Sequence, residues 1–114
     1  MRSLGTTGVQ VEAVSLGGEG ILRTRGRARE AVPMILEALS LGVRYCDTAP
    51  AYDDSEAYYG EAFRSAGKAA RDRVILASKT HARTSAGALR LLADSLRRLP
   101  TGSMSGRITC RQSP

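Results

Sequence analysis

Short apolar runs that alternate with amphipathic, helix-forming stretches constrain the fold of this chain most strongly. Residues 43–46 and 74–77 have the length and character of strands, and each run is followed by a segment with apolar residues at helical spacing. A chain that repeats strand and helix in this order builds a parallel sheet, because parallel neighbours are joined by a helical crossover. The sequence therefore predicts an α/β fold.

The amino-terminal segment precedes this repeat. Residues 2–11 alternate around a Thr-Thr-Gly turn at residues 6–8, which predicts a β-hairpin, and residues 11–16 form a candidate first strand. A helix is expected over residues 29–41, with Pro33 in its first turn and Gly42 as its carboxyl-terminal stop. The predicted order is a hairpin followed by three strand–helix units.

Two further helices follow the two apolar runs. Asp53 and Glu56 have the spacing of a helix N-terminus with a capping-box acid, and that helix is expected over residues 53–65. The next helix begins at Thr84 or Ser85. Its predicted buried stripe follows the i, i+3, i+4 repeat and consists of Ala88, Leu91, Leu92, Ser95, Leu96 and Leu99.

The most reactive side chains follow the two strands. An Asp-Thr-Ala-Pro-Ala-Tyr motif at residues 47–52 comes directly after the first run, and Ser-Lys-Thr at residues 78–80 comes after the second. An ammonium close to a phenol favours the ionised phenol, and an aspartate close to the ammonium keeps it charged and in place. Tyr52 could then donate a proton to a developing alkoxide, with Lys79 and Asp47 supporting it. Each residue also has an ordinary alternative, namely Asp47 as a turn residue, Tyr52 as a packing aromatic and Lys79 as a solvated strand end.

These two motifs resemble three of the four catalytic positions of the aldo-keto reductases. Similarity to that family extends in order over residues 1–99, including the Leu-Gly-Thr-Thr-Gly stretch at 4–8 and the Ser-Leu-Arg-Arg-Leu stretch at 95–99. The resemblance implies the amino-terminal portion of a (β/α)8 TIM barrel, NADP(H) as cofactor and a small carbonyl compound as substrate. It also implies that Asp47, Tyr52 and Lys79 are catalytic.

The chain departs from the family pattern after residue 99. The family places a catalytic histidine after its fourth strand, whereas this chain has His81 alone, at a different position. Residues 100–114 match no expected strand, and we expect them to form a disordered tail. Our hypothesis is that this tail is out-of-frame sequence, since shifted codons over residues 99–104 can encode Thr-Asp-Arg-Leu-Asp. The coding DNA tests this hypothesis, which fails if no shifted frame restores the family pattern.

The length of the chain limits what it can form. A (β/α)8 barrel needs about 250 residues, and this chain has 114. Three parallel strands cannot close a barrel, so we expect a truncated barrel with exposed sheet edges and little or no reductase activity. The alternative is a non-enzymatic remnant that acts as an interaction or subunit-capping piece through its open sheet edge.

Composition bears on the possible partners, metal sites and localisation of the chain. The net charge is +6, but several arginines lie after the last acid, Asp94, so we expect no nucleic-acid partner. Cys46 and Cys110 form no metal-ligand cluster, and Cys46 is expected to be buried. No membrane span or signal peptide is apparent, which favours a cytoplasmic protein.

Several other residues have both ordinary and functional interpretations. We expect His81 to be a solvated loop residue, Tyr58 and Tyr59 to be packing residues, and the Gly-Gly-Glu-Gly stretch at 17–20 to be a tight turn toward the site. Arginines alternate over residues 23–29 and are expected to form a solvated basic loop, with contact to a phosphate group as the functional alternative. No residue is assigned to the cofactor, because the family binds the nucleotide mainly through the second half of its barrel.

Overall fold

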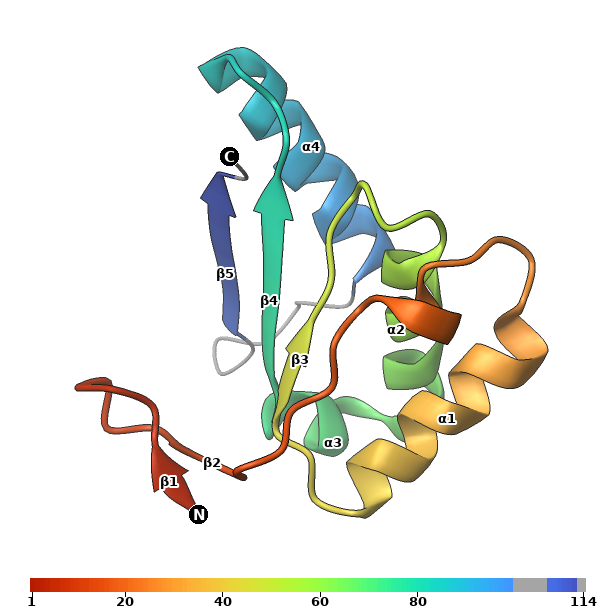
Figure 1. Cartoon of the computed structure of the whole chain (residues 1–114), viewed down its shortest axis with the longest axis vertical. Coiled ribbons are helices and arrows are strands. Elements are labelled where there is room, and N and C mark those ends of the chain that lie inside the picture. Colours follow the sequence, from red (N-terminus) through yellow and green to blue (C-terminus); the bar gives the residue numbers. More distant parts are fainter. Residues whose placement is uncertain (100–106, 113–114) are drawn as a thin grey trace.

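The computed structural model describes residues 1–99 and, for the backbone alone, residues 107–112. Figure 1 shows an α/β arrangement in which helices pack beside a small parallel sheet, with the amino-terminal hairpin below. The elements are β1 Arg2–Ser3, β2 Gln10–Val11, the short 3-10 helix η1 Gly20–Leu22, α1 Ala28–Ser40, β3 Tyr45–Asp47, α2 Ser55–Ala66, α3 Lys68–Asp72, β4 Ile75–Thr80, α4 Ser85–Arg98 and β5 Arg107–Gln112. The predicted α/β class is confirmed.

The parallel sheet has the strand order β3-β4-β5. Tyr45 pairs with Ile75 and Asp47 with Ala77, so β3 and β4 run in the same direction and in register. The predicted strand over residues 11–16 is wrong in its extent, because Leu16 forms an isolated parallel bridge to Cys46. Val14 in that segment is 71% exposed, so the segment lacks the buried side chains that would hold a longer strand against the sheet.

The described residues form a hydrophobic core between the sheet and its helices. Cys46 of β3 and Leu76 of β4 face this core, as the alternation of side chains along a strand requires. Tyr59 and Phe63 of α2 stack with their ring centroids 6.1 Å apart. The core is completed by Leu22, Ala31, Val32, Ile35, Tyr58, Ala62, Val74 and Leu99. This packing fixes one face of the sheet against α1 and α2.

The predicted helices are present, with some differences at their ends. Pro33 lies in the second turn of α1 and not in its first, because α1 already begins at Ala28. Gly42 ends the helical segment as expected, with a φ of 96° that favours glycine. The expected stripe on α4 is only partly buried, since Leu96 is 43% exposed while Ser95 and Leu99 are buried. Among the described elements, α4 is in contact mainly with α2 and β4, which leaves the rest of its apolar side uncovered.

The 3-10 helix η1, helix α3 and strand β5 were not expected. Helix α3 follows directly on Gly67 and has only five residues, too few for a periodic pattern to be recognised. The expectation of no strand after residue 99 is wrong for Arg107–Gln112, which pair in parallel with β4 as β5. An open strand edge pairs readily through its backbone, and Ile108 and Thr109 have the β-branched side chains that favour strands. The expectations for residues 100–106 and 113–114 lie outside the described residues.

In the part of the chain that the structure describes, no helix combines the length and the apolar character that a membrane crossing requires.

Candidate active site

Asp47 and Lys79 meet where two parallel strands end. Asp47 is the last residue of β3, and Lys79 is the last but one of β4. Both strands point in the same direction in Figure 1, which brings their carboxyl ends together. The Lys79 Nζ donates to Asp47 Oδ2 at 3.0 Å, to Asp47 Oδ1 at 3.2 Å and to the Thr48 carbonyl oxygen at 2.9 Å. These three acceptors hold an ammonium whose side chain is 11% exposed.

Tyr52 lies beside this ion pair. Its backbone amide donates to the Ala49 carbonyl, so residues 49–52 form a turn that returns the ring toward the strand ends. The Lys79 Nζ lies 4.6 Å from the centre of the Tyr52 ring, a cation–π contact. The structure therefore brings Asp47, Tyr52 and Lys79 together, as the sequence predicts, with the ammonium over the face of the ring.

A second cation contacts the same ring. The guanidinium carbon of Arg23 lies 5.0 Å from the centre of the Tyr52 ring, and Arg23 also pairs with Glu19 at 3.3 Å. Arg23 was expected to be one residue of a solvated basic loop, and the structure assigns it a place at the candidate site. The sequence contains no signal for this contact, because it depends on how the loop after η1 folds back over the loop after β3.

Glu56 does not form the predicted capping box. Helix α2 begins at Ser55 with Asp54 as its N-cap, and no side chain caps it. Glu56 is instead 1% exposed and accepts hydrogen bonds from Ser78, Ser95 and Arg98. The capping interpretation fails because donors from β4 and α4, namely the buried Ser78 and Ser95 and the partly exposed Arg98, bind the carboxylate.

The comparisons with known proteins agree with this arrangement. Residues 13–104 match the model of the Aldo/keto reductase family. The aldo-keto reductase YhdN of Bacillus subtilis (strain 168) is 37% identical over 83 residues, which cover 68% of this chain and 24% of the relative. The chain belongs to the aldo/keto reductase family. The expected resemblance to this family is thereby confirmed over residues 13–99, and the match extends to residue 104, into the tail that was expected not to match.

Solved aldo/keto reductases share the fold of this chain. PA4992 of Pseudomonas aeruginosa, a candidate aldo-keto reductase, is 34% identical with a TM-score of 0.73, over 88% of this chain and 42% of its own. An aldo/keto reductase of Klebsiella pneumoniae, crystallised with NADP and acetate, is 32% identical with a TM-score of 0.65, over 80% of this chain and 32% of its own. The chain thus spans less than half the length of these relatives, and its described residues form part of a TIM barrel without closing one.

Several residues that the sequence analysis singled out lie outside the cluster of Asp47, Tyr52 and Lys79. His81 is exposed in the loop after β4, as expected. Gly18 packs against the carbonyl of Asp47, so the glycine-rich stretch is a close turn beside the site. Tyr59 is a packing residue whose hydroxyl donates to the carbonyls of Leu16 and Gly17. Cys46 is fully buried, and burial raises the pKa of its thiol to about 12.

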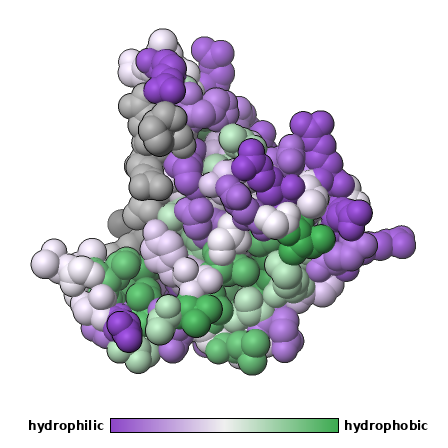
Figure 2. All heavy atoms as spheres, viewed as in Figure 1, coloured by the Kyte–Doolittle hydropathy of each residue, from purple (hydrophilic) through white to green (hydrophobic). Residues whose placement is uncertain are grey.

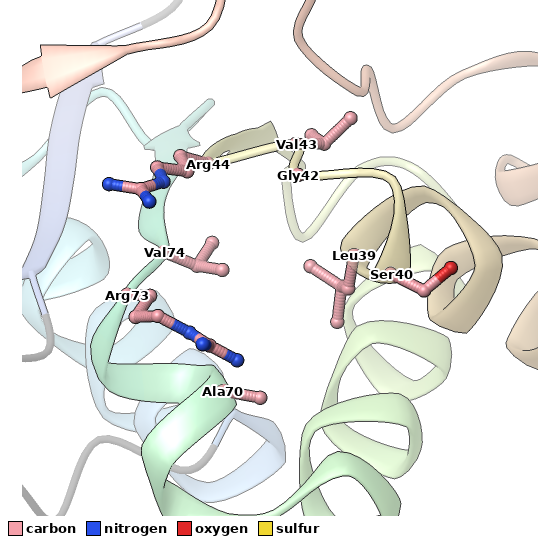
Figure 3. Close-up of a pocket in the computed structure, with 8 residues that line it drawn as sticks. All are labelled: Leu39, Ser40, Gly42, Val43, Arg44, Ala70, Arg73 and Val74. Carbon is pink, nitrogen blue, oxygen red and sulfur yellow. The ribbon is translucent and has the colours of Figure 1, made fainter.

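Two cavities that are lined by described residues lie at opposite ends of the sheet. Figure 3 shows one of about 230 Å³ near the amino ends of β3 and β4, lined by Leu39, Ser40, Gly42, Val43, Arg44, Ala70, Arg73 and Val74. Another of about 340 Å³ lies beyond the carboxyl end of β4 and is lined by Thr80, Ala82, Arg83, Thr84, Ser85 and Ala88. Barrel enzymes carry their active sites at the carboxyl end of the strands, so the second cavity is on the side of Lys79. Among the described residues, no three metal-binding side chains cluster.

Proposed function

We propose that Asp47, Tyr52 and Lys79 form the proton-donating part of a reductase site that converts an aldehyde or ketone to an alcohol with NADP(H). The observation that carries the proposal is the position of the Lys79 ammonium, which contacts the Asp47 carboxylate and the Tyr52 ring together. Relatives from Klebsiella pneumoniae crystallised with NADP and with NADPH support the choice of cofactor. The choice of an aldehyde or ketone as substrate rests on the membership of this chain in the aldo/keto reductase family.

The proposed roles follow from charge. Tyr52 gives its proton to the carbonyl oxygen as that oxygen becomes an alkoxide, and its own oxygen acquires the negative charge. Lys79 stabilises that charge, because its ammonium is held by three acceptor atoms of Asp47 and Thr48 and lies beside the Tyr52 ring. Asp47 holds the ammonium and does not touch the substrate. Solvent returns the proton to Tyr52 after the alcohol leaves.

The described residues can account for the proton transfer in this reaction. When bound, the nicotinamide supplies the hydride that reduces the carbonyl carbon. The Lys79 and Arg23 cations beside Tyr52 suit an anionic ligand or a developing negative charge. No residue of this chain is assigned to the nucleotide.

A chimera tests the proposed roles. Residues 13–99 of this chain would replace the corresponding segment of the Bacillus subtilis relative, and NADPH consumption with a reactive aldehyde would be measured. We expect turnover, and we expect Tyr52→Phe to lower it by about 100-fold or more. Tyr45→Phe at the opposite end of β3 is the matched control and should leave turnover unchanged. Equal turnover with and without the Tyr52 hydroxyl would contradict the assignment.

For the chain by itself we propose little or no turnover. No histidine is assigned to orient the carbonyl, and the described strands close no barrel. The same assay on the purified chain tests this. Robust turnover that Tyr52→Phe abolishes would refute the proposed inactivity while supporting the site.

The second candidate function is that of an interaction partner. Within the described residues the sheet has three strands and one bridge, so its outer edges carry backbone groups that can pair with another chain. Figure 2 shows apolar residues gathered in the lower part of one face, and Met1, Val14 and Leu41 are exposed large hydrophobics. A defined complex with a full-length relative, measured by light scattering, would favour this function, and an unfolded monomer would count against it.

A further inference from the structure

The first two residues of α2 reach the ends of both site-bearing strands. Ser55 and Glu56 are buried, with 0% and 1% of their surfaces exposed. Polar side chains that are buried to this degree need hydrogen-bond partners, and their partners here lie next to Asp47 and next to Lys79.

Ser55 is linked to the end of β3. Its Oγ shares a hydrogen bond of 2.8 Å with Thr48 Oγ1, and Thr48 is fully buried. Thr48 directly follows Asp47, and its carbonyl oxygen is one of the three acceptors of the Lys79 ammonium. The position of Thr48 therefore affects both sides of the ion pair.

Glu56 is linked to the end of β4. Its Oε2 accepts from Ser78 Oγ at 3.0 Å and from Ser95 Oγ at 2.7 Å, while its Oε1 accepts from Arg98 Nη1 at 3.0 Å. Ser78 directly precedes Lys79, and the two side chains project from opposite faces of the strand. Fixing Ser78 from the helix side thus fixes the backbone from which Lys79 extends toward Asp47.

We propose that Ser55 and Glu56 are positioning residues that set the separation of Asp47 and Lys79. Ser55 holds the β3 end and Glu56 the β4 end, and because the two residues are adjacent on one helix they hold the strand ends at a fixed distance. The inference deepens the proposed function and rests on it for its catalytic meaning. The inference also states that these two residues keep the Lys79 ammonium in contact with Asp47. This contact can be tested without an activity assay.

The amine of Lys79 gives the readout. The chain has two lysines, Lys68 and Lys79, and their side chains are 73% and 11% exposed. The experiment measures the rate at which each amine of the full chain is reductively methylated, with the two sites separated by peptide mass mapping. Exposed Lys68 reports general reactivity, and Lys79 reports its own attachment to Asp47.

Ser55→Ala, Ser78→Ala and Glu56→Gln are the test variants. We expect each to raise the methylation rate of Lys79 by about threefold or more, since each removes a buried hydrogen bond that holds one strand end. The rate of Lys68 should not change. Glu61→Gln, an exposed acid on the same helix, is the matched control and should leave both rates unchanged.

A purely structural role predicts a different result. Val32→Ala removes core volume at a distance from the strand ends and serves as the comparison. The proposal is overturned if Lys79 keeps its wild-type rate in the serine variants, or if Val32→Ala raises that rate equally. If Glu56→Gln does not fold by circular dichroism, the two serine variants decide. If the chimera is inactive while Lys79 is methylated faster in these variants, the proposed function is contradicted and the positioning role of Ser55 and Glu56 is still supported.

Discussion

At the residue scale, Gly18 shows how closely the backbone approaches the candidate site. A Cβ atom at this position would lie 2.5 Å from the Asp47 carbonyl oxygen, 2.9 Å from Thr48 Cα and 3.0 Å from Ser55 Oγ. Two of these neighbours are backbone atoms, which cannot rotate away. Any side chain at residue 18 must therefore displace the end of β3.

We predict that Gly18→Ala lowers the free energy of unfolding by about 1–3 kcal/mol, the usual cost of overpacking a filled site. Gly17→Ala is the control, because a Cβ at residue 17 would meet nothing within 4 Å. Urea denaturation of both variants measures the difference. A loss of similar size in the two variants would show that close packing at Gly18 is not the cause.

The thiol of Cys46 gives a second residue-scale prediction. The residue is fully buried, and burial raises the pKa of its thiol to about 12, so almost no thiolate is present at neutral pH. In a Cys110→Ser variant, where Cys46 is the remaining cysteine, we expect a maleimide to react at least about 100-fold more slowly than in denaturant. Rapid labelling of the native variant would contradict the burial.

The sequence could identify some of the site residues and not others. Asp47, Tyr52 and Lys79 could be predicted because each lies at or shortly after the end of a recognisable strand, and strand ends meet in a parallel sheet. The roles of Arg23 and Glu56 could not, since their partners lie on elements far along the chain. A capping-box pattern is local, and it was overridden by contacts that exist only after α2 and α4 pack.

At the scale of elements, long periodic segments were predicted better than short ones. The apolar spacing of α1, α2 and α4 depends on the sequence of each helix alone, so their existence followed from it. The bridge at Leu16 and strand β5 are defined by pairing with a neighbour, which no local pattern encodes. Helix α3 is too short to carry a pattern.

The start of α4 gives a prediction at this scale. Thr84 is the N-cap, and its Oγ1 accepts from the Gly87 amide at 3.0 Å. Thr84→Ala removes this acceptor and should lower the free energy of unfolding by about 1 kcal/mol. Ser85→Ala, one residue further on, removes a hydroxyl without removing the cap and is the matched control. Chemical denaturation that finds the two variants equally stable would contradict a capping role for Thr84.

At the scale of the whole molecule, the core that joins the helices to the sheet contains ionisable groups that are completely buried. Cys46 of β3 and Tyr59 of α2 are both buried with 0% exposure. Burial raises the pKa of the Cys46 thiol to about 12 and raises the pKa of the Tyr59 phenol above its usual range. Neither group can ionise in the folded chain at moderately alkaline pH, whereas both can ionise after unfolding.

This difference predicts a loss of stability at alkaline pH. An unfolded thiol titrates near ~8.5, so above that pH the unfolded chain has released a proton that folded Cys46 retains until about pH 12. Because the folded state then binds more protons, the free energy of unfolding falls by about 1.4 kcal/mol per pH unit in this window. Tyr59 adds a second contribution above the usual phenol pKa of ~10.

Urea denaturation at a series of pH values, with wild type and Cys46→Ala in parallel, measures this effect. Between the titration of the unfolded thiol and that of the unfolded phenol, stability should fall in the wild type and stay nearly level in Cys46→Ala. Above that range both proteins should lose stability, because Tyr59 is present in each. Parallel curves for the two proteins would mean that the Cys46 thiol titrates alike in the folded and unfolded chain, and that the core around it is open to solvent.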